Sequence, residues 1–236
     1  MKFLWNLDHF DSKIFGFKVA KITQIESQDY IADLINELSK NKIKYAKYRV
    51  ASNSFSIIRE LQNHGFVLVD GLISLTTNPF ELKIGSPASE IREATKKDLT
   101  SLKKITSGLY LLSRIYNDPL ISRDKADEFF VKWVENSISG EAADLVLVWE
   151  DKGEILGYVT LQKKGQIPLI GVSKEARGRG IAKKLIEAVL YKFKEWMVKE
   201  VIIETQMSNI PALRVDQDCG FKVVNSYLTF RWAKND

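Results

Sequence analysis

The chain is poor in the residues that build disulfide frameworks and metal centres. It has one cysteine, Cys219, and two histidines among 236 residues. A single thiol excludes an internal disulfide framework and is typical of a reducing compartment, and no ligand spacing indicates a metal site. No apolar run reaches the ~18 residues of a membrane span, and Asp8 comes too early for a signal peptide. We therefore expect a cytoplasmic protein without a metal or a membrane partner.

The chain also lacks a dense block of positive charge. Lys and Arg number 35 against 30 Asp and Glu, and the formal net charge of +5 is spread along the sequence. This balance is compatible with anionic small molecules and predicts no nucleic-acid partner. An apolar share of 45% is ordinary for a protein with a real core, and the length allows one large domain or two small ones.

Proline, glycine and serine gather at one break, 83–89, which predicts a module at 1–84 and a larger domain at 90–236. The fold class expected is α/β with a mixed sheet. Before the break, apolar patterns predict strands at 3–7, 17–22, 44–50, 66–69 and 72–76, and helices at 28–39 and 54–63. After it, they predict strands at 145–150, 155–163, 167–172, 200–205, 221–224 and 227–232, a short strand from Ile91, and helices at 97–107, 124–137, 180–196 and 210–218.

Two stretches of the chain resemble each other. Gly65-Phe66 and Gly220-Phe221 lie 155 residues apart, and each pair ends a series of strand, asparagine (Asn53 or Asn209) and helix, with an apolar hairpin after it. We favour a partial internal duplication over chance similarity. The first copy has no loop of Arg and Gly, so we expect it not to bind an anion.

The second copy contains a loop suited to an anion. The apolar strand at 167–172 is followed by Arg177-Gly-Arg-Gly-Ile-Ala182, and a helical pattern begins there. Glycines let backbone N–H groups approach a diphosphate at a helix N-terminus, where the helix dipole is positive. A dinucleotide-binding fingerprint would need a third glycine where Lys183 stands, and no Walker A loop occurs. Glu200, about twenty residues on, is the one point in favour of the dinucleotide-binding fingerprint, and a basic surface turn is the other alternative.

The order strand, Arg177-x-x-Gly180-x-Ala182, helix, strand, Asn209, helix, Gly220-Phe221 resembles the GNAT superfamily of N-acetyltransferases, as does the opening Ile91-Arg-x-Ala-Thr-x-x-Asp98. The resemblance covers about 91–236 and implies that 1–84 is a degenerate, partial GNAT-like βαββ module. Further motifs resemble the dTDP-fucosamine acetyltransferases, which act on nucleotide-linked amino sugars: Asp11-Ser-x-x-Phe15-Gly16, Ser113-Arg114-x-x-x-Asp118-Pro119, Phe129-x-x-Lys-Trp133-Val-Glu-Asn136 and Thr205-Gln206-Met207-x-Asn209.

The resemblance implies acetyl-CoA as the acetyl donor. Loop amides would hold its pyrophosphate, and the strand before the loop would splay from its neighbour and pair with pantetheine. An N–H of Ile170 or Val172 would stabilise the oxyanion. Asn209 matches a cofactor contact, and equally fits a helix N-cap. The cofactor residues expected are Ile170, Gly171, Val172, Arg177, Gly178, Arg179, Gly180, Ile181, Ala182 and Asn209.

The proton donor departs from the family pattern. Such enzymes often place a tyrosine four residues before the glycine of the Gly-Phe pair, where this chain has Asp216. An ordinary Asp, with a pKa of ~3.9, is ionised at neutral pH. Asp216 is therefore a buried, protonated acid, a base or amine anchor, or a helix-surface residue, and we favour the last. Tyr227 on the last strand is a candidate donor or a half-buried aromatic, and the same holds for Tyr158.

The polar loop at 113–119 is where this fold builds acceptor pockets. Arg114 would bind the diphosphate of a nucleotide sugar and Asp118 a sugar hydroxyl or ammonium, with salt bridges as the alternative. Cys219 has no adjacent base, so we expect direct attack by the amine on the thioester. The predicted acceptor is a dTDP-4-amino-4,6-dideoxyhexose. Alternatives are another small amine, a peptide N-terminus, or a non-catalytic acyl-CoA-binding module. Unpaired strand ends make a homodimer an expectation.

Overall fold

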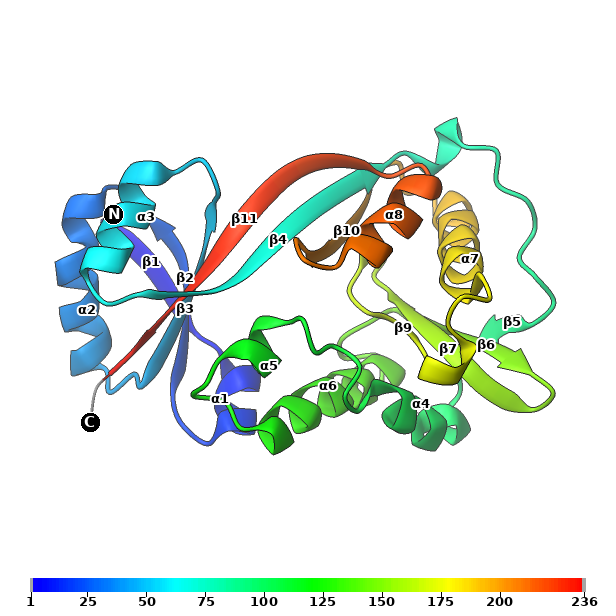
Figure 1. The fold of residues 1–236 in the computed structure, drawn as a ribbon, viewed down its shortest axis with the longest axis horizontal. Coiled ribbons are helices and arrows are strands. Elements are labelled where there is room, and N and C mark those ends of the chain that lie inside the picture. Colours follow the sequence, from blue (N-terminus) through cyan, green and yellow to red (C-terminus); the bar gives the residue numbers. More distant parts are fainter. Residues whose placement is uncertain (1, 235–236) are drawn as a thin grey trace. The chain divides into compact units, whose positions relative to one another are not determined.

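The computed structural model describes residues 2–234 and separates into two compact units (Figure 1). The first unit comprises the chain up to Leu72, 112–129, and the chain from Asn225 onward; the second comprises 73–111 and 130–224. The break expected at 83–89 does not coincide with this division. The chain from Asn225 onward belongs to the first unit, where residues 227–233 pair with residues 45–51.

The first unit is a sheet with helices. Its strands lie in the order β1, β2, β3, β11, with β2 and β3 parallel and the other neighbours antiparallel. Three apolar residues one helical turn apart, Ile31, Leu34 and Leu38, are fully buried, and each such side chain contributes ~1.5–3 kcal/mol. The elements are β1 (Phe3–Leu7), α1 (His9–Phe15), β2 (Val19–Ile25), η1 (Gln28–Tyr30), α2 (Ile31–Lys40), β3 (Tyr45–Ala51), α3 (Phe55–Asn63) and α5 (Arg114–Asn117).

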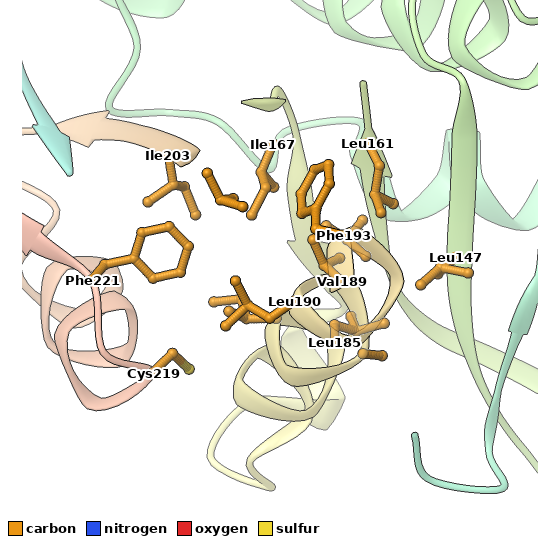
Figure 2. Close-up of a cluster of buried hydrophobic side chains, with 14 of the residues drawn as sticks. Leu147, Leu161, Ile167, Leu185, Val189, Leu190, Phe193, Ile203, Cys219 and Phe221 are labelled. Atoms are coloured by element: carbon orange, nitrogen blue, oxygen red, sulfur yellow. The ribbon is translucent and has the colours of Figure 1, made fainter. Parts of the chain in front are cut away.

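The second unit holds an antiparallel sheet in the order β5, β6, β7, β9, and a separate ladder in which β10 lies between β4 and β8. Helix α7 packs through Leu185, Val189 and Phe193, which Figure 2 shows among the buried side chains of the core. The elements are η2 (Pro79–Glu81), β5 (Ile91–Glu93), η3 (Lys96–Asp98), α4 (Leu99–Thr106), β6 (Leu145–Asp151), β7 (Glu154–Leu161), β8 (Gln166–Ile167), β9 (Ile170–Val172), η4 (Lys174–Ala176), α7 (Ile181–Glu195), β10 (Val201–Gln206) and α8 (Ile210–Asp218).

Three elements contribute residues to both units: β4 (Val67–Thr77), α6 (Arg123–Ile138) and β11 (Lys222–Ala233). The two hairpins expected after the Gly-Phe pairs are wrong, because β4 and β11 are single long strands. In β11, the backbone at Asn225-Ser226 does not turn, since the Ser52 N–H donates to the Ser226 carbonyl at 3.0 Å and the ladder with β3 continues beyond it.

The element order of the repeat is nevertheless present. The series β3, Asn53, α3, Gly65, β4 corresponds to β10, Asn209, α8, Gly220, β11. Gly65 and Gly220 end their helices at φ +78° and +89°, a conformation that favours glycine. The internal duplication itself stays a prediction.

Candidate active site

The strand before the glycine loop changes partners in the second unit. At Gln166 and Ile167, β8 pairs in parallel with β10, whereas three residues later β9 has β7 as its one strand partner among residues 2–234. Pro168 stands between them and has no N–H to donate to a ladder. We call the place where β9 separates from β10 the parting. The splaying that the resemblance implies for this strand is therefore a feature of the structure.

Hydrogen-bond alternation shows which groups face the parting. The Thr160 N–H donates to the Leu169 carbonyl at 2.9 Å, and the Ser173 N–H donates to the Leu156 carbonyl at 2.8 Å. In an antiparallel pair, hydrogen-bonded and non-hydrogen-bonded positions alternate. Ile170 and Val172 thus occupy the non-hydrogen-bonded positions opposite β7, and their N–H groups point to the side that β10 has left. These are the two groups expected to stabilise an oxyanion.

The loop that follows is shaped by two glycines. Gly178 and Gly180 both have φ +77°, where an L-residue with a side chain is strained, and a Cβ on either would have no heavy atom within 4 Å. Gly180 is the N-cap of α7, and among residues 2–234 no side-chain cap hydrogen bond forms at this helix start. Buried Ile181 holds the helix start in the core. The first N–H groups of α7 are therefore open to a ligand at the positive end of the helix dipole.

The two arginines of the loop differ. The guanidinium of Arg179 pairs with Asp151 of the β6–β7 hairpin at 2.8 Å, and both side chains are partly exposed. Arg177 is exposed and makes no ion pair with any residue from 2 to 234. Because Asp151 offsets the charge of Arg179, Arg177 offers the less compensated charge to an anion. The expected role of both in cofactor binding stays a prediction.

Asn209 is engaged within the protein. Its Oδ1 accepts from the Ala212 N–H at 3.4 Å, which caps α8, and its Nδ2 donates to Thr205 Oγ1 at 3.1 Å. The structure thus shows the N-cap interpretation, and the cofactor contact stays a prediction.

Asp216 is buried, so its interpretation as a helix-surface residue is wrong. The residue is 3% exposed, and its Oδ2 is buried without a hydrogen-bond partner among the described residues. Burial without a compensating partner disfavours the carboxylate and raises the pKa of Asp216 to about 7. At neutral pH a large share of this carboxyl is therefore protonated. The helical spacing alone did not indicate this, because burial depends on segments packed against α8.

Cys219, close to Asp216 in sequence, is also buried. Burial, with Glu187 nearby, raises the pKa of its thiol to about 12. A thiol that keeps its proton at neutral pH is a poor nucleophile.

Tyr158 belongs to a group of hydroxyls inside the second unit. It is fully buried on β7, and its hydroxyl lies 2.8 Å from Thr106 Oγ1 and 2.9 Å from the Tyr110 hydroxyl. Tyr110, which sequence reasoning did not single out, also donates to the Ile170 carbonyl at 3.2 Å. The available signal was its position in the connection between the two predicted helices, directly before the polar stretch at 113–119.

Tyr227 lies on the part of β11 that belongs to the first unit, opposite Ala51 of β3. It is half-buried, and the Arg49 guanidinium lies 5.9 Å from its ring centroid, within cation–π distance. Its role as a proton donor stays a prediction.

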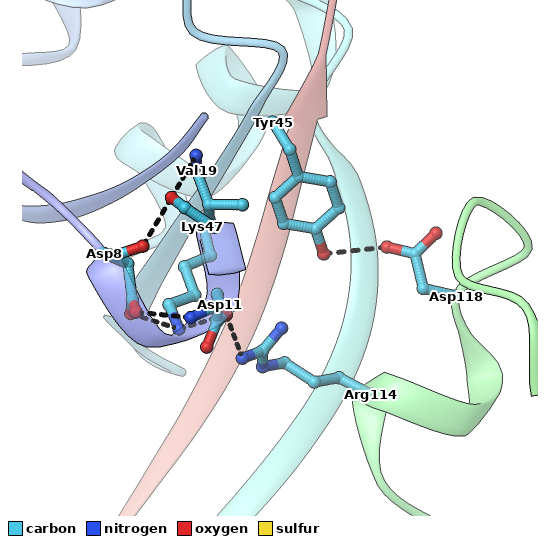
Figure 3. Close-up of polar contacts among 8 residues, drawn as sticks. Asp8, Asp11, Val19, Tyr45, Lys47, Arg114 and Asp118 are labelled. Carbon is cyan, nitrogen blue, oxygen red and sulfur yellow. Dashed lines mark hydrogen bonds and ion pairs between the residues drawn. The ribbon is translucent and has the colours of Figure 1, made fainter. Parts of the chain in front are cut away.

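The two predicted acceptor residues lie in a buried ionic cluster of the first unit (Figure 3). Arg114 contacts Asp11 at 3.0 Å, and Lys47 contacts Asp11 at 2.6 Å and Asp8 at 2.8 Å. Asp11, from the Asp-Ser-x-x-Phe-Gly motif, thus pairs with Arg114 of the Ser-Arg-x-x-x-Asp-Pro motif. Figure 3 shows Lys47 and Arg114 converging on it.

Asp118 is equally engaged. It accepts from the Tyr45 hydroxyl at 2.8 Å and lies 3.3 Å from Arg231 Nε, while 1% exposed. Burial and the neighbouring Asp118 raise the pKa of Tyr45 far above its usual value. The salt-bridge interpretation describes what the structure shows for Arg114 and Asp118, and their contact with an acceptor stays a prediction.

Metal-binding clusters and membrane-spanning helices are both absent from residues 2–234. No cluster of three or more His, Cys, Asp or Glu side chains in this range could hold a metal ion. None of the helices in this range is long and apolar enough to cross a membrane.

Two of the relatives found by sequence comparison are similar to different parts of the chain. The chain is 27% identical over 162 residues to the spore coat polysaccharide biosynthesis protein SpsD of Bacillus subtilis, covering 67% of this chain and 56% of SpsD. It is 33% identical over 108 residues to an N-alpha-acetyltransferase of Sulfurisphaera tokodaii, covering 39% of this chain and 64% of that protein. The chain thus spans less than two thirds of the length of either relative.

Structure comparison shows the fold. A GCN5-related N-acetyltransferase from Sphaerobacter thermophilus superposes with a TM-score of 0.66 at 17% identity, covering 98% of this chain and 76% of the other. A tandem GNAT protein from the clavulanic acid biosynthesis pathway superposes with a TM-score of 0.58 at 11% identity, and the match covers 92% of this chain and 76% of the other. The acetyltransferase (GNAT) family model matches residues 109–221, a range that includes the parting and the glycine loop. Slightly less than half of the chain thus matches the acetyltransferase (GNAT) family, and the whole chain has the fold of GNAT proteins.

Proposed function

We propose that the chain is an N-acetyltransferase that takes its acetyl group from acetyl-CoA and transfers it to an amine. The observation that carries this proposal is the parting of β9 from β10 just before a helix start that no side chain caps. A strand edge suits an extended, amide-containing ligand, and open helix N–H groups suit a diphosphate. Acetyl-CoA combines the two.

The residues present fit this donor. The open space above Gly178 and Gly180 leaves their backbone accessible, and the N–H groups of 178–182 would hold the pyrophosphate. Arg177, with Arg179 as a secondary charge, adds attraction, and Asn209 lies at the start of the next helix. The strand Ile170-Gly171-Val172 would pair with the pantetheine arm. When bound, acetyl-CoA supplies an acyl group activated as a thioester.

Three features of the chain support the transfer chemistry. The N–H groups of Ile170 and Val172 would donate to a developing oxyanion. With a pKa of about 7, a large share of the Asp216 carboxyl is protonated at neutral pH, which makes it the candidate acid for the departing thiolate. Cys219 keeps its proton, which supports direct attack by the amine without a covalent acetyl-enzyme. Tyr227 is the second candidate acid.

The acceptor we propose is the amino group of a nucleotide-linked amino sugar of the dTDP-4-amino-4,6-dideoxyhexose type, with Arg114 and Asp118 as its contacts. Similarity to SpsD over 67% of the chain supports an acceptor used in polysaccharide biosynthesis. Similarity to an N-alpha-acetyltransferase, at 33% identity over a shorter range, favours a peptide N-terminus as the second candidate.

We also propose that residues 1–84 are a degenerate copy of the catalytic domain at 90–236, and that the protein forms a homodimer. The shared element order of the two halves and the similarity to a tandem GNAT protein support the duplication.

The test is thiol release from acetyl-CoA with a panel of amines. The panel contains dTDP-4-amino-4,6-dideoxygalactose, the matching sugar without nucleotide, amino acids, and a peptide with a free N-terminus. We expect rapid release with the nucleotide sugar alone. Equal turnover of the free sugar would contradict the nucleotide-linked acceptor, and turnover of the peptide alone would favour the second candidate. CoA binding without release for any amine would leave a non-catalytic acyl-CoA-binding module.

A further inference from the structure

The hydroxyl groups of Thr106, Tyr158 and Tyr110 form a chain with one direction. Thr106 Oγ1 donates to the Leu102 carbonyl at 2.7 Å. A hydroxyl has a single proton and two acceptor lone pairs. Thr106 therefore accepts from Tyr158 at 2.8 Å, and Tyr158, whose proton is used, accepts from Tyr110 at 2.9 Å. The single Tyr110 proton is shared between this contact and the longer one, 3.2 Å, to the Ile170 carbonyl. Tyr110 is the first donor of the chain, and no member of the chain donates to its oxygen.

The Tyr110 end of this series of hydroxyl groups lies at the parting. In an antiparallel strand the N–H and C=O of one residue point to the same side. The Ile170 carbonyl, which Tyr110 contacts at 3.2 Å, is thus on the same side of β9 as the Ile170 N–H. The Tyr110 oxygen is therefore next to the group expected to polarise a thioester carbonyl.

Packing holds the hydroxyl in place. A Cβ on Gly171 would meet Leu109 at 2.5 Å and the Tyr158 ring at 2.9 Å, so these side chains occupy the space above β9 that a larger residue would need. The Tyr110 ring stacks on buried Phe130, with centroids 4.5 Å apart. The oxygen is fixed by rings and backbone on several sides, which is the preorganisation that a substrate-positioning group needs.

We propose that the Tyr110 oxygen accepts a hydrogen bond from the attacking amine of the acceptor and aims the nitrogen lone pair at the thioester carbonyl. This inference rests on the proposed function and deepens it. The surroundings, Leu109 and Phe130, are apolar and favour the uncharged amine, which is the form that has a lone pair for attack.

Tyr110 takes no part in proton transfer. The nitrogen lone pair forms the C–N bond, and the C–S bond breaks with its electron pair on sulfur. Sulfur then takes the Asp216 proton, and the surplus proton on nitrogen leaves to solvent, from which the Asp216 carboxylate is reprotonated. Burial, together with the adjacent Tyr158, raises the pKa of Tyr110 well above its usual value, so the phenol keeps its own proton.

The test is Tyr110→Phe, which removes the oxygen and retains the ring on Phe130. A hydrogen bond of ~0.5–1.5 kcal/mol corresponds to a roughly 2- to 12-fold effect. We expect the acceptor KM to rise by about this factor while the acetyl-CoA KM is unchanged. Calorimetric binding of the acceptor to the enzyme–CoA complex should weaken equally. The matched control is Tyr191→Phe on α7, half-buried and outside the chain of hydroxyls.

Each outcome is decisive when the assay uses both dTDP-4-amino-4,6-dideoxygalactose and a peptide with a free N-terminus, together with thermal melting. Unchanged acceptor KM and acceptor affinity, in a wild type that turns over, would overturn the role of Tyr110 alone. Weaker CoA binding in Tyr110→Phe, with acceptor binding intact, would assign the hydroxyl to the donor strand and also overturn it. A wild type that binds CoA and acetylates neither amine would remove the proposed function and this inference with it.

Discussion

Replacing Asp216 by Asn tests both the burial of this carboxyl and its place in the chemistry. Burial raises the pKa of Asp216 from 3.8 to about 7. A carboxyl with the higher pKa in the folded state binds its proton more tightly there, so its contribution to stability is greatest below 3.8 and is lost as pH rises to about 7. Each pKa unit corresponds to ~1.4 kcal/mol, so the full loss of stability is ~4 kcal/mol. Asn is neutral throughout and has no such loss.

Urea unfolding at pH 4 and pH 8.5 measures this effect. We expect Asp216→Asn to gain stability relative to the wild type by several kcal/mol between the two pH values, up to the ~4 kcal/mol above. The control Asp218→Asn, exposed on the same helix, should show no such gain. If the free energies of unfolding of Asp216→Asn and the wild type differed by the same amount at both pH values, the burial argument would be refuted.

Initial rates of thiol release between pH 5.5 and 9 test the catalytic part. The wild-type rate should fall as pH rises through about 7, where the Asp216 carboxyl loses its proton. Asp216→Asn should lack this falling limb and be slower at pH 6 by ~10²–10⁴, the usual contribution of a positioned acid. Wild-type rates in the variant, with the same falling limb, would exclude Asp216 as the proton donor.

Three further predictions follow from local geometry. Gly180→Ala should weaken CoA binding by about tenfold in a titration, since Ala at positive φ costs ~1–2 kcal/mol and distorts the helix start, whereas Gly140→Ala, with similar φ and open space, should leave binding unchanged. Arg114→Met should cost ~3–5 kcal/mol in urea unfolding, because it removes one partner of a buried ionic cluster; a loss below 1 kcal/mol would contradict the pairing. Gly171→Ala should lower stability by ~1–3 kcal/mol through its clash with Leu109, and an unchanged melting temperature would show that this packing gives way freely.

The glycine loop and most elements could be predicted from sequence because their signals are local. Gly178 and Gly180 adopt a backbone conformation that few other residues tolerate, and α7 repeats its apolar residues with helical spacing. The GNAT fold was implied by the resemblance that the order of these elements and motifs has to that family. The strand parting was expected only through the family resemblance, and the structure shows it at Pro168.

Long-range packing accounts for what sequence reasoning missed. The boundary predicted at 83–89 relied on composition, which carries no information about pairings such as that of the last part of β11 with β3, more than 170 residues away. The break predicted between strands at 221–224 and 227–232 does not occur, because that pairing satisfies the backbone there. Tyr110 carries no motif, and only its contact with Ile170 distinguishes it from other aromatic residues.

Local sequence is thus sufficient for the anion-binding loop, because backbone conformation and helix polarity depend on neighbouring residues. Protonation and pairing of single side chains are a different matter. Burial raises the pKa of Asp216 to about 7. Arg114 and Asp118 form ion pairs with residues from other parts of the chain. A charge responds to the dielectric and the partners around it in space, and those are decided only when distant segments pack together.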